Sequence, residues 1–309
     1  ALYNVSYHDD AWDVMGGLSA QMFRCNHWGY LTYIANEEVE LQYLTDGGKY
    51  KYYDSDADKN DYSWFVKAAY NFGSGWNAFA DMQMRIVDYT TDGVNDKFIK
   101  GKKDGRKFYT QQQLNIDETY VFYNPKAGIS YTRGGHKAYA SVAYANREPE
   151  RNNFTDNSSA ALPKAEHLFD TELGYQYRTA NWYASANLYY MRYINQFVMT
   201  GAKSDIGEAI TSNIKNSYRL GAELSAGWSP LQWLSLEGNA ALSQNKLKNF
   251  TEEVEAWDTE AVHNTYAKST LSYSPSAILN GFVDVHFGGF SATWHTNFVS
   301  RQYLDNTQS

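Results

Sequence analysis

The sequence predicts an all-β protein, an antiparallel up-and-down transmembrane β-barrel to which this chain contributes about twelve strands. Apolar and polar residues alternate with a period of two along nearly the whole chain, and helical periodicity is nowhere sustained. The alternating segments are longer than the ~5–6 residues usual in globular sheets and can cross a bilayer at a ~45° tilt. Short and long connections alternate between them, as in an outer-membrane barrel.

The strands can be placed in order from this alternation. In the fourth, Trp76, Ala78 and Ala80 oppose Asn77 and Asp81. The eleventh segment is too long for one strand, and Ser274-Pro275-Ser276 marks a bulge or junction within it. We expect strands near 1–8, 12–23, 62–72, 76–90, 119–132, 136–147, 167–178, 182–198, 217–228, 232–246, 264–287 and 290–303.

Connections of two lengths separate these strands. Tight turns are expected at 73–75, 134–135, 179–181, 229–230 and 288–289. Long polar loops are expected near 24–61, 91–118, 148–166, 199–216 and 248–263, with a hairpin extension at 27–44. This rhythm places all tight turns at one end of a meander. A soluble β-sandwich also alternates but would not keep the rhythm, so it is the less favoured fold.

The phase of the alternation predicts which side chains face lipid. We expect an outward face made of Trp76, Ala78, Ala80, Met82, Ala184, Ala186, Leu188, Leu220, Leu224, Leu234 and Leu236. The opposite face should carry Asp81, Arg85, Asn187, Arg219, Glu223 and Glu237.

Composition narrows the possible classes of protein. The chain has 309 residues, 35 acidic and 27 basic side chains and a formal net charge of −8, which argues against nucleic-acid binding. The single cysteine, Cys25, can form neither an internal disulfide nor a cysteine-rich metal site. No run of about 18 apolar residues suggests a transmembrane helix, and the first residues do not resemble a signal peptide.

Several segments resemble TonB-dependent outer-membrane receptors. YANREPERNNF (144–154) resembles the R-x-P-x-R motif of that family, and LPKAEHLFDTELGYQY (162–177) resembles its P-E…E-x-G-Y strand. NSYRLGAELSAGW (216–228), TLSYSPS (270–276) and FVSRQYLDNT (298–307) are also similar to family segments. The resemblance covers most of the chain, especially 119–309.

The resemblance implies a 22-stranded barrel with an internal plug and a TonB box that couples uptake to the proton-motive force. This chain lacks the plug and the TonB box and has too few strands, so we expect residues 1–309 to form a single partial barrel domain without a linker. Taken alone, such a sheet should not close. The implied location is the outer membrane of a Gram-negative bacterium.

Two loops carry candidate ligand-binding residues. The segment 96–107 contains six cations, and on an outer loop it could attract an anionic ferric chelate or lipopolysaccharide phosphates. The other candidate is Trp257, which lies in the acidic loop 251–260. The candidate ligand-binding residues are Lys97, Lys100, Lys102, Lys103, Arg106, Lys107 and Trp257.

The resemblance further implies a structural clamp at the barrel rim. The clamp is made of two cations and two carboxylates, Arg147, Glu148, Glu150 and Arg151. The full set of rim and structural-motif residues is Arg147, Glu148, Pro149, Arg151, Glu172 and Gly174. Asp54, Asp56 and Asp58 are spaced like the start of a calcium loop, but Lys59 and Phe65 occupy the positions of the required Gly and Glu. No catalytic residue, metal ligand or cofactor is expected.

We therefore expect part of a TonB-dependent receptor that imports a ferric siderophore, haem, cobalamin or oligosaccharide. The expected partners are outer-membrane lipid, lipopolysaccharide, TonB through the plug and TonB box, and a surface lipoprotein. The alternatives are a complete smaller barrel, acting as a passive channel or lipid hydrolase, and a soluble β-sandwich binding module.

Overall fold

In the computed structural model of the chain, the residues that can be described are 1–35, 50–103, 106–156, 162–203, 207, 209–254 and 262–307, without the side chains of 98–109 and 253. Among them, no helix is both long and apolar enough to span a membrane. The elements are β1 (Leu2–His8), β2 (Trp12–Leu31), β3 (Tyr50–Gly73), β4 (Trp76–Lys103), β5 (Arg106–Arg133), β6 (His136–Arg147), α2 (Arg151–Thr155), β7 (Glu166–Arg178), β8 (Trp182–Lys203), β9 (Ala209–Leu231), β10 (Leu234–Val254), β11 (Val262–Thr270), β12 (Ala277–Phe287) and β13 (Phe290–Val299).

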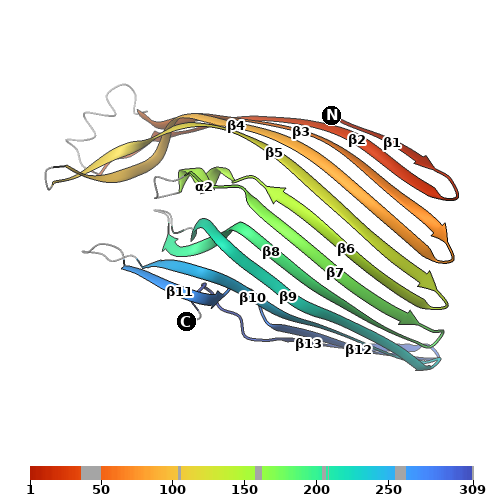
Figure 1. Cartoon of the computed structure of the whole chain (residues 1–309). Coiled ribbons are helices and arrows are strands. Elements are labelled where there is room, and N and C mark those ends of the chain that lie inside the picture. The colour runs from red at the N-terminus through yellow and green to blue at the C-terminus, as the bar shows by residue number, and fades with distance from the viewer. Residues whose placement is uncertain are drawn as a thin grey trace.

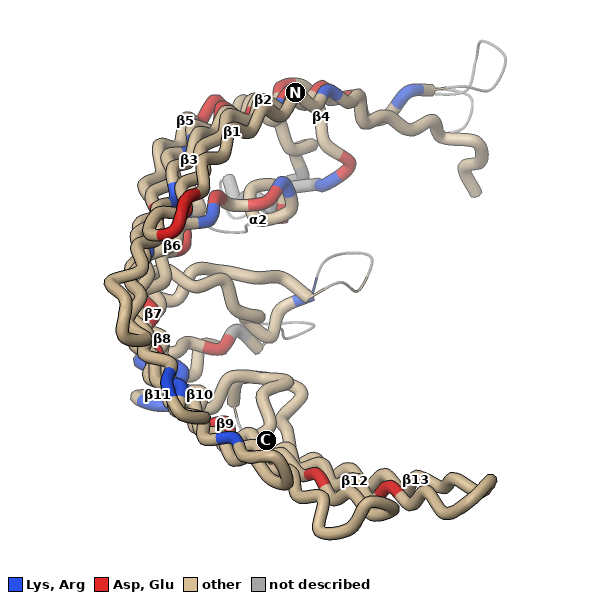
Figure 2. Tube along the Cα trace, turned by 90° about the vertical axis from the view of Figure 1, so that its right-hand side faces the viewer, with Lys and Arg blue, Asp and Glu red and all other residues tan. Residues whose placement is uncertain are grey.

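The strands form one antiparallel sheet in chain order, except that β12 pairs with β10 and β11 lies off this path, also on β10 (Figure 1). Seen along the strands, the sheet is a curved, open wall (Figure 2). In the described part of the chain, β1 and β13 do not pair with each other. The prediction of an unclosed partial barrel is therefore confirmed. The smaller closed barrel and the two-sheet sandwich are not what the structure contains.

The connections β1–β2, β3–β4, β5–β6, β7–β8, β9–β10 and β12–β13 are tight and lie at one end of the sheet, the turn end. The other connections, including the short one between Lys103 and Arg106, lie at the opposite end, the loop end (Figure 1). In the turn between β5 and β6, Gly134 and Gly135 have φ of 59° and 83°, which suits the hairpin turns that need two residues in the left-handed region. One turn was misplaced: β9 and β10 connect at 232–233, because β9 continues through Ser229 and Pro230 to Leu231.

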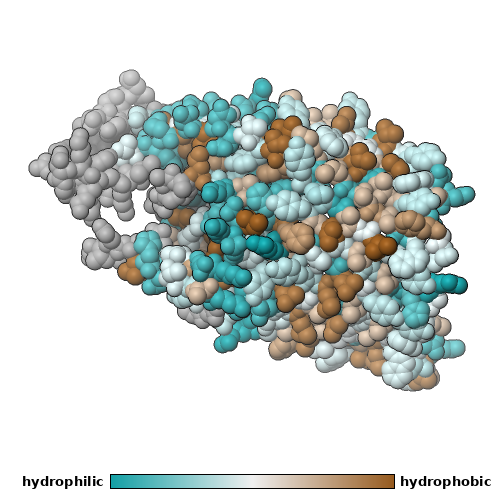
Figure 3. Space-filling view, viewed as in Figure 1, coloured by the Kyte–Doolittle hydropathy of each residue, from teal (hydrophilic) through white to brown (hydrophobic). Residues whose placement is uncertain are grey.

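The register confirms that the predicted lipid-facing residues share one face. Ala80 is paired with Ala68 and Ala127, and Leu188 with Leu173 and Ala222. This face is the convex one. The segment that carries α2 lies inside the curve of the sheet (Figure 2), and Arg85, one of the residues predicted to face away from lipid, contacts that segment through Glu148. On the convex face, apolar side chains gather over the part of the strands nearer the turn end and hydrophilic ones lie toward the loop end (Figure 3).

Most of the predicted long loops were wrong, because their described parts are strand extensions. Residues 24–31 pair with 50–58, which places the start of the expected 27–44 extension in a hairpin; 36–49 lie outside the described residues. Residues 91–94 pair with 113–116, and 98–103 pair with 106–111. A paired hairpin satisfies its backbone polar groups without an apolar face, so polar composition did not exclude strands there. In the connection after β6, the described residues 148–150, 156 and 162–165 are irregular and 151–155 form α2.

The eleventh predicted strand is two strands. β11 pairs with the loop-end half of β10, from Lys246 to Val254, and β12 pairs with its turn-end half, from Leu234 to Leu242. The break at 271–276 contains Ser274-Pro275-Ser276, where the sequence indicated a bulge or junction. Because both strands lie beside β10, the strand order of the meander is kept.

Six glycines each lie beneath an aromatic ring on the concave face. In each case the ring belongs to the residue directly paired with the glycine on the next strand. A Cβ on Gly174 would lie 2.0 Å from Cε1 of Tyr139, so only glycine leaves room for the ring. The pairs are Gly17–Phe65, Gly29–Tyr53, Gly128–Phe79, Gly174–Tyr139, Gly221–Tyr189 and Gly227–Tyr183.

A small hydrophobic core closes the loop end of β8–β11. Leu247 and Phe250 both belong to it, together with Val198, Ile214 and Leu271. Residues three apart cannot share a face in a regular strand. They do so here because Asn249, between them, has a φ of 53°, which reverses the alternation.

Candidate ligand-binding vestibule

The segment 148–156, after β6, folds back into the concavity of the sheet at the loop end (Figure 2). It contains α2, whose N-terminus is held by a hydrogen bond from the Glu150 N–H to Asn153 Oδ1 at 2.7 Å. We call this docked segment and the concave side chains it covers on β2–β5 the vestibule. The vestibule is the best candidate for a functional site because it gathers charged and aromatic groups from distant parts of the chain.

Glu148 is the anchor of the docked segment. Its side chain is 9% exposed and accepts hydrogen bonds from Lys59 Nζ at 2.6 Å and from Arg85 at 2.8 and 2.9 Å. Arg85 also binds Asp61, with Nε 2.9 Å from Oδ2. Burial alone would raise the pKa of the Glu148 carboxyl, but the hydrogen bonds from Lys59, the backbone and Arg85 outweigh it and hold the pKa below its usual value. Glu148 is therefore ionised at neutral pH.

Arg151 occupies a different electrostatic position. Its guanidinium donates to Thr91 Oγ1 at 2.9 Å and to Ser55 Oγ at 3.0 Å, and it has no carboxylate partner among the described residues. Hydroxyl groups do not neutralise its charge. Arg151 therefore leaves a positive charge in the vestibule that could attract an anionic group.

Aromatic and sulfur-containing side chains lie beside Arg151. Tyr89 and Phe154 are both buried, with ring centroids 5.6 Å apart, and Cys25 packs against them. His27 Nε2 lies 3.0 Å from Cys25 Sγ. Burial, and then the charge of Arg151, lower the pKa of His27, so its imidazole is neutral at neutral pH. This corner of the vestibule thus presents one cation among uncharged groups.

Two contacts tie the far end of the segment to other strands. Asn153 donates from Nδ2 to Thr211 Oγ1 on β9 at 2.8 Å. Asp156 forms an ion pair with Lys97 on β4. The segment therefore links β3 and β4 to β9 across the concavity.

The predicted rim residues do not all lie together. Glu148, Pro149 and Arg151 belong to the docked segment, and Arg147 pairs with Glu166 Oε2 at 3.3 Å beside it. Glu172 and Gly174 lie in the middle of β7, paired with residues of β6 and β8. Gly174 makes room for the Tyr139 ring rather than forming part of a rim.

The basic segment 96–107 is a hairpin rather than a loop. Lys100, Lys102 and Lys103 lie on β4 and Arg106 and Lys107 on β5, at its tip. The side chains of these five residues lie outside the described part, as does Trp257. Lys97, which is described, is already paired with Asp156.

No group of three or more metal-ligating His, Cys, Asp or Glu side chains occurs among the described residues. The aspartates that are spaced like a calcium loop lie on β3, on the convex face, and have partners other than a metal. Asn26 Nδ2 donates to Asp54 and Asp56, and Arg24 pairs with Asp58.

Sequence reasoning missed Lys59 and Asp61 as partners in the vestibule and did not place Arg85 there. It also missed Asn306, which is 1% exposed, accepts from the Ser272 N–H and donates to the Met199 carbonyl, each at 2.8 Å. The only available signal for Asn306 was the family-like segment 298–307 that contains it.

A family model described as "TonB dependent receptor-like, beta-barrel" matches residues 3–309. No curated protein matches the chain. Among solved structures, the chain is similar to the copper transporter OprC, with a TM-score of 0.69 and 13% identity over 96% of this chain and 42% of that one. It is also similar to the ferric yersiniabactin uptake receptor FyuA of Yersinia pestis, with a TM-score of 0.64 and 15% identity over 99% of this chain and 43% of that one.

The unliganded ferric citrate transporter FecA gives a TM-score of 0.64 and 14% identity, over 100% of this chain and 42% of that one. The chain thus spans less than half the length of these structures. At such low identity they show the fold alone, whereas the family model extends over nearly every residue. The chain belongs to the TonB-dependent receptor family and corresponds to part of its β-barrel.

Proposed function

We propose that this chain forms part of the wall and outer vestibule of a receptor that imports a scarce nutrient by energy-coupled transport across the outer membrane. The candidates are a ferric siderophore, haem, cobalamin or an oligosaccharide. The observation that carries the proposal is the charge of Arg151, whose partners among the described residues are hydroxyl groups, in a vestibule where Lys59, Arg85 and Lys97 are each paired with a carboxylate. This charge favours an anionic ligand, and an iron chelate fits best.

The remaining roles follow from this proposal. Lys100, Lys102, Lys103, Arg106 and Lys107, at the tip of the β4–β5 hairpin, would attract the anion from solution. Lys97 would chiefly position the docked segment through Asp156, and Trp257 would contact the ligand from its own loop. Coupling would require TonB acting through a plug and a TonB box. Lipopolysaccharide and a surface lipoprotein are the further proposed partners. Bond chemistry is not part of this mechanism.

The test is uptake by cells that express the full receptor in a host lacking its own TonB-dependent receptors. Radiolabelled catecholate, hydroxamate and carboxylate ferric chelates, haem, cobalamin and an oligosaccharide are compared with and without TonB. We expect TonB-dependent uptake of one anionic ligand. Uptake that is independent of TonB, or absent for every ligand, would contradict the proposal.

Two variants then separate the role of Arg151 from a general charge effect. Arg151→Gln should weaken ligand binding about tenfold, and Arg151→Lys should retain part of it. The matched control is Arg24→Gln, because Arg24 lies on the convex face and pairs with Asp58. Equal effects of Arg151→Gln and Arg24→Gln would remove Arg151 from the ligand site.

A further inference from the structure

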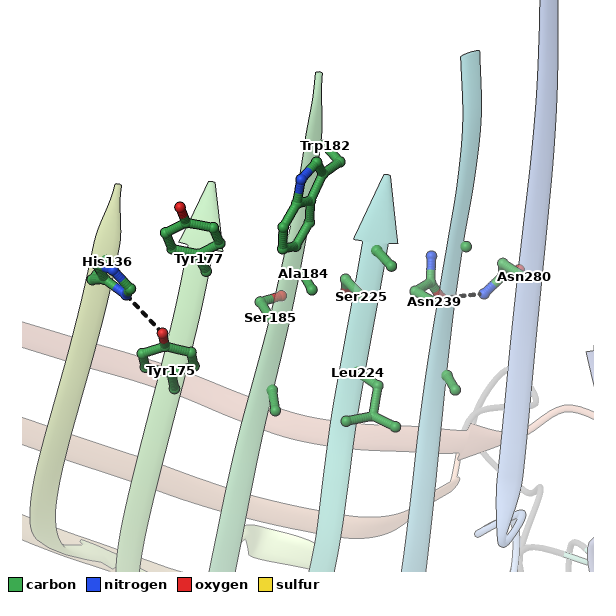
Figure 4. A pocket seen from close by; sticks show the side chains of 14 residues that line it. His136, Tyr175, Tyr177, Trp182, Ala184, Ser185, Leu224, Ser225, Asn239 and Asn280 are labelled. Carbon is green, nitrogen blue, oxygen red and sulfur yellow. Dashed lines mark hydrogen bonds between the residues drawn. The ribbon is translucent and has the colours of Figure 1, made fainter. Parts of the chain in front are cut away.

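A shallow groove lies on the convex face near the turn end, over β6–β10 and the neighbouring β12 (Figure 4). We propose that this groove binds one anionic phospholipid, with the lipid phosphate beside Arg133 and His136 and an acyl chain between β8 and β10. The inference rests on the outer-membrane placement proposed above but concerns a different face from the vestibule and a different ligand.

The shape of the groove follows from the register of three strands. Ala184, Ala226 and Gly238 are paired in one row across β8, β9 and β10. The next row toward the turn end is bulky, with Trp182, Trp228 and Leu236. The next row toward the loop end is Ala186, Leu224 and Ala240.

The small row, continued by Ala186 and Ala240, is therefore a trough bounded by the bulky row on the turn side and by Leu224 on the loop side. The groove as a whole has a volume of about 830 Å³, within the ~300–1,000 Å³ range of small-molecule sites. Ser185, Ser225, Asn239 and Asn280 also border the groove, but the register places their side chains on the concave face. The groove therefore presents an apolar, recessed surface to the membrane on the convex face of the sheet, and such a surface can hold an acyl chain.

One end of the groove is polar and aromatic. His136 and Tyr175 are hydrogen-bonded, with His136 Nδ1 2.7 Å from the Tyr175 hydroxyl, and the His136 ring lies 4.4 Å from that of Tyr177 (Figure 4). These contacts fix the imidazole and leave its second nitrogen without a partner among the described residues. Arg133 is paired with His136 across the β5–β6 turn, on the same face, and has no ion-pair partner in the described part.

The arrangement matches a phospholipid in both charge and depth. Tyr and Trp side chains favour the boundary between headgroups and acyl chains, and Tyr177 and Trp182 lie at this end of the groove with ring centroids 5.2 Å apart. A cation at that depth faces lipid phosphate. The site lies at the turn end, the periplasmic end in this family's fold, where the leaflet is phospholipid rather than lipopolysaccharide.

The experiment uses the full receptor purified in a mild non-ionic detergent, titrated with phosphatidylglycerol or phosphatidylcholine and followed by native mass spectrometry. We expect one phosphatidylglycerol to bind about tenfold more tightly than phosphatidylcholine. Arg133→Gln combined with His136→Gln should abolish this preference. Ala226→Leu combined with Gly238→Leu, which fills the trough, should abolish binding of both lipids.

Two matched controls accompany these variants. Ala78→Leu combined with Ala80→Leu enlarges small convex residues on β4, outside the groove, and should leave binding unchanged. Arg178→Gln removes a cation near the same end of the sheet whose guanidinium stacks on Tyr183, 4.5 Å from the ring centroid, and it should also have no effect.

Several results would overturn the inference. The first is that the variant Arg133→Gln/His136→Gln still prefers phosphatidylglycerol. The second is that the variant Ala226→Leu/Gly238→Leu still binds both lipids. The third is that the receptor forms a dimer once its lipid is removed and that Ala226→Leu/Gly238→Leu prevents this dimer. The last result would assign the groove to a second copy of the chain. Lipid binding in detergent needs no nutrient. If the receptor transports its nutrient but shows no lipid preference, the lipid site alone is refuted. If the receptor is found outside the outer membrane, the proposed function is refuted.

Discussion

Replacing Glu148 with alanine should release the docked segment 148–156 from the concave face while leaving the sheet intact. Three hydrogen bonds from charged donors end on this carboxylate, and its side chain is 9% exposed. Breaking a fully buried ion pair costs about 3–5 kcal/mol, whereas an exposed pair is worth about 0–1 kcal/mol. The partners of Glu148 determine where this case falls between those limits.

Arg85 keeps Asp61 when Glu148 is lost, and the Lys59 side chain is 36% exposed and can be solvated. The expected cost is therefore about 2 kcal/mol, or about a 30-fold shift in the equilibrium between docked and released segment. Glu148→Gln should cost less, because an amide oxygen can still accept one of the hydrogen bonds.

Hydrogen exchange of the full receptor in lipid nanodiscs measures this equilibrium. The reporters are the amides of Asn153 and Asp156, which donate to the carbonyls of Glu150 and Asn152 inside the segment. Both should exchange about 30-fold faster in Glu148→Ala. The control is Asp92→Asn, which removes a carboxylate charge from an exposed position on β4.

Exchange within about threefold of the wild type would refute the reasoning, because the carboxylate would then contribute little to docking. An equal acceleration in Asp92→Asn would refute it differently, by showing that net charge rather than the Glu148 contacts controls the segment.

Four further outcomes are expected. Gly174→Ala places a Cβ 2.0 Å from the Tyr139 ring and should lower the stability measured by urea unfolding in detergent by about 2 kcal/mol. Adding Tyr139→Ala should restore most of the lost stability, and no restoration would exclude the clash as the cause. Asn306→Ala leaves the Ser272 N–H and the Met199 carbonyl without partners and should cost about 2 kcal/mol in the same assay, whereas a neutral result would show that water replaces both bonds. Leu247→Ala, at a fully buried site, should cost about 3 kcal/mol, and a cost below about 1 kcal/mol would mean that the cluster collapses around the gap. The pKa of Glu148 is lower in the docked segment than in the unfolded chain, where it is ~4.3, so its contribution to docking is present above that value and is lost as the pH falls through the folded pKa. Hydrogen exchange of the segment should therefore accelerate only below about pH 4. An onset near pH 6 would contradict this.

The turn-end half of the fold could be predicted because the membrane imposes a regular pattern on it. Trp76, Ala78 and Ala80 share a face in the structure as the alternation requires. The loop-end half could not, because polar residues prevail along its strands, which are stabilised by hairpin pairing and by two small apolar clusters. The signal in residues 54–59 was an alternation of aspartate with serine, alanine and lysine, which composition alone suggested was a loop.

The vestibule was only partly predictable for a different reason. Arg147 to Arg151 are contiguous and match a family motif, so they could be named from the sequence. The partners of Glu148 lie 89 and 63 residues away, on strands whose curvature brings them together. No local pattern encodes that proximity, and the unneutralised charge of Arg151 becomes visible only once every other cation of the vestibule has found its partner.

The division of β10 between two partners has a consequence for the order of folding. Every other pairing among the described strands joins consecutive strands, which can form as hairpins with little loss of loop entropy. The pairing of β12 with Leu234–Leu242 instead spans β11 and the break after it, so even its partners nearest in sequence, Leu242 and Ala277, close a longer loop than the nearest partners of any other described strand pair. We expect the hairpin of β12 and β13 to dock after β10 and β11 have paired. Conditions that slow this closure should accumulate a species in which the turn-end half of β10 still exposes an unpaired edge.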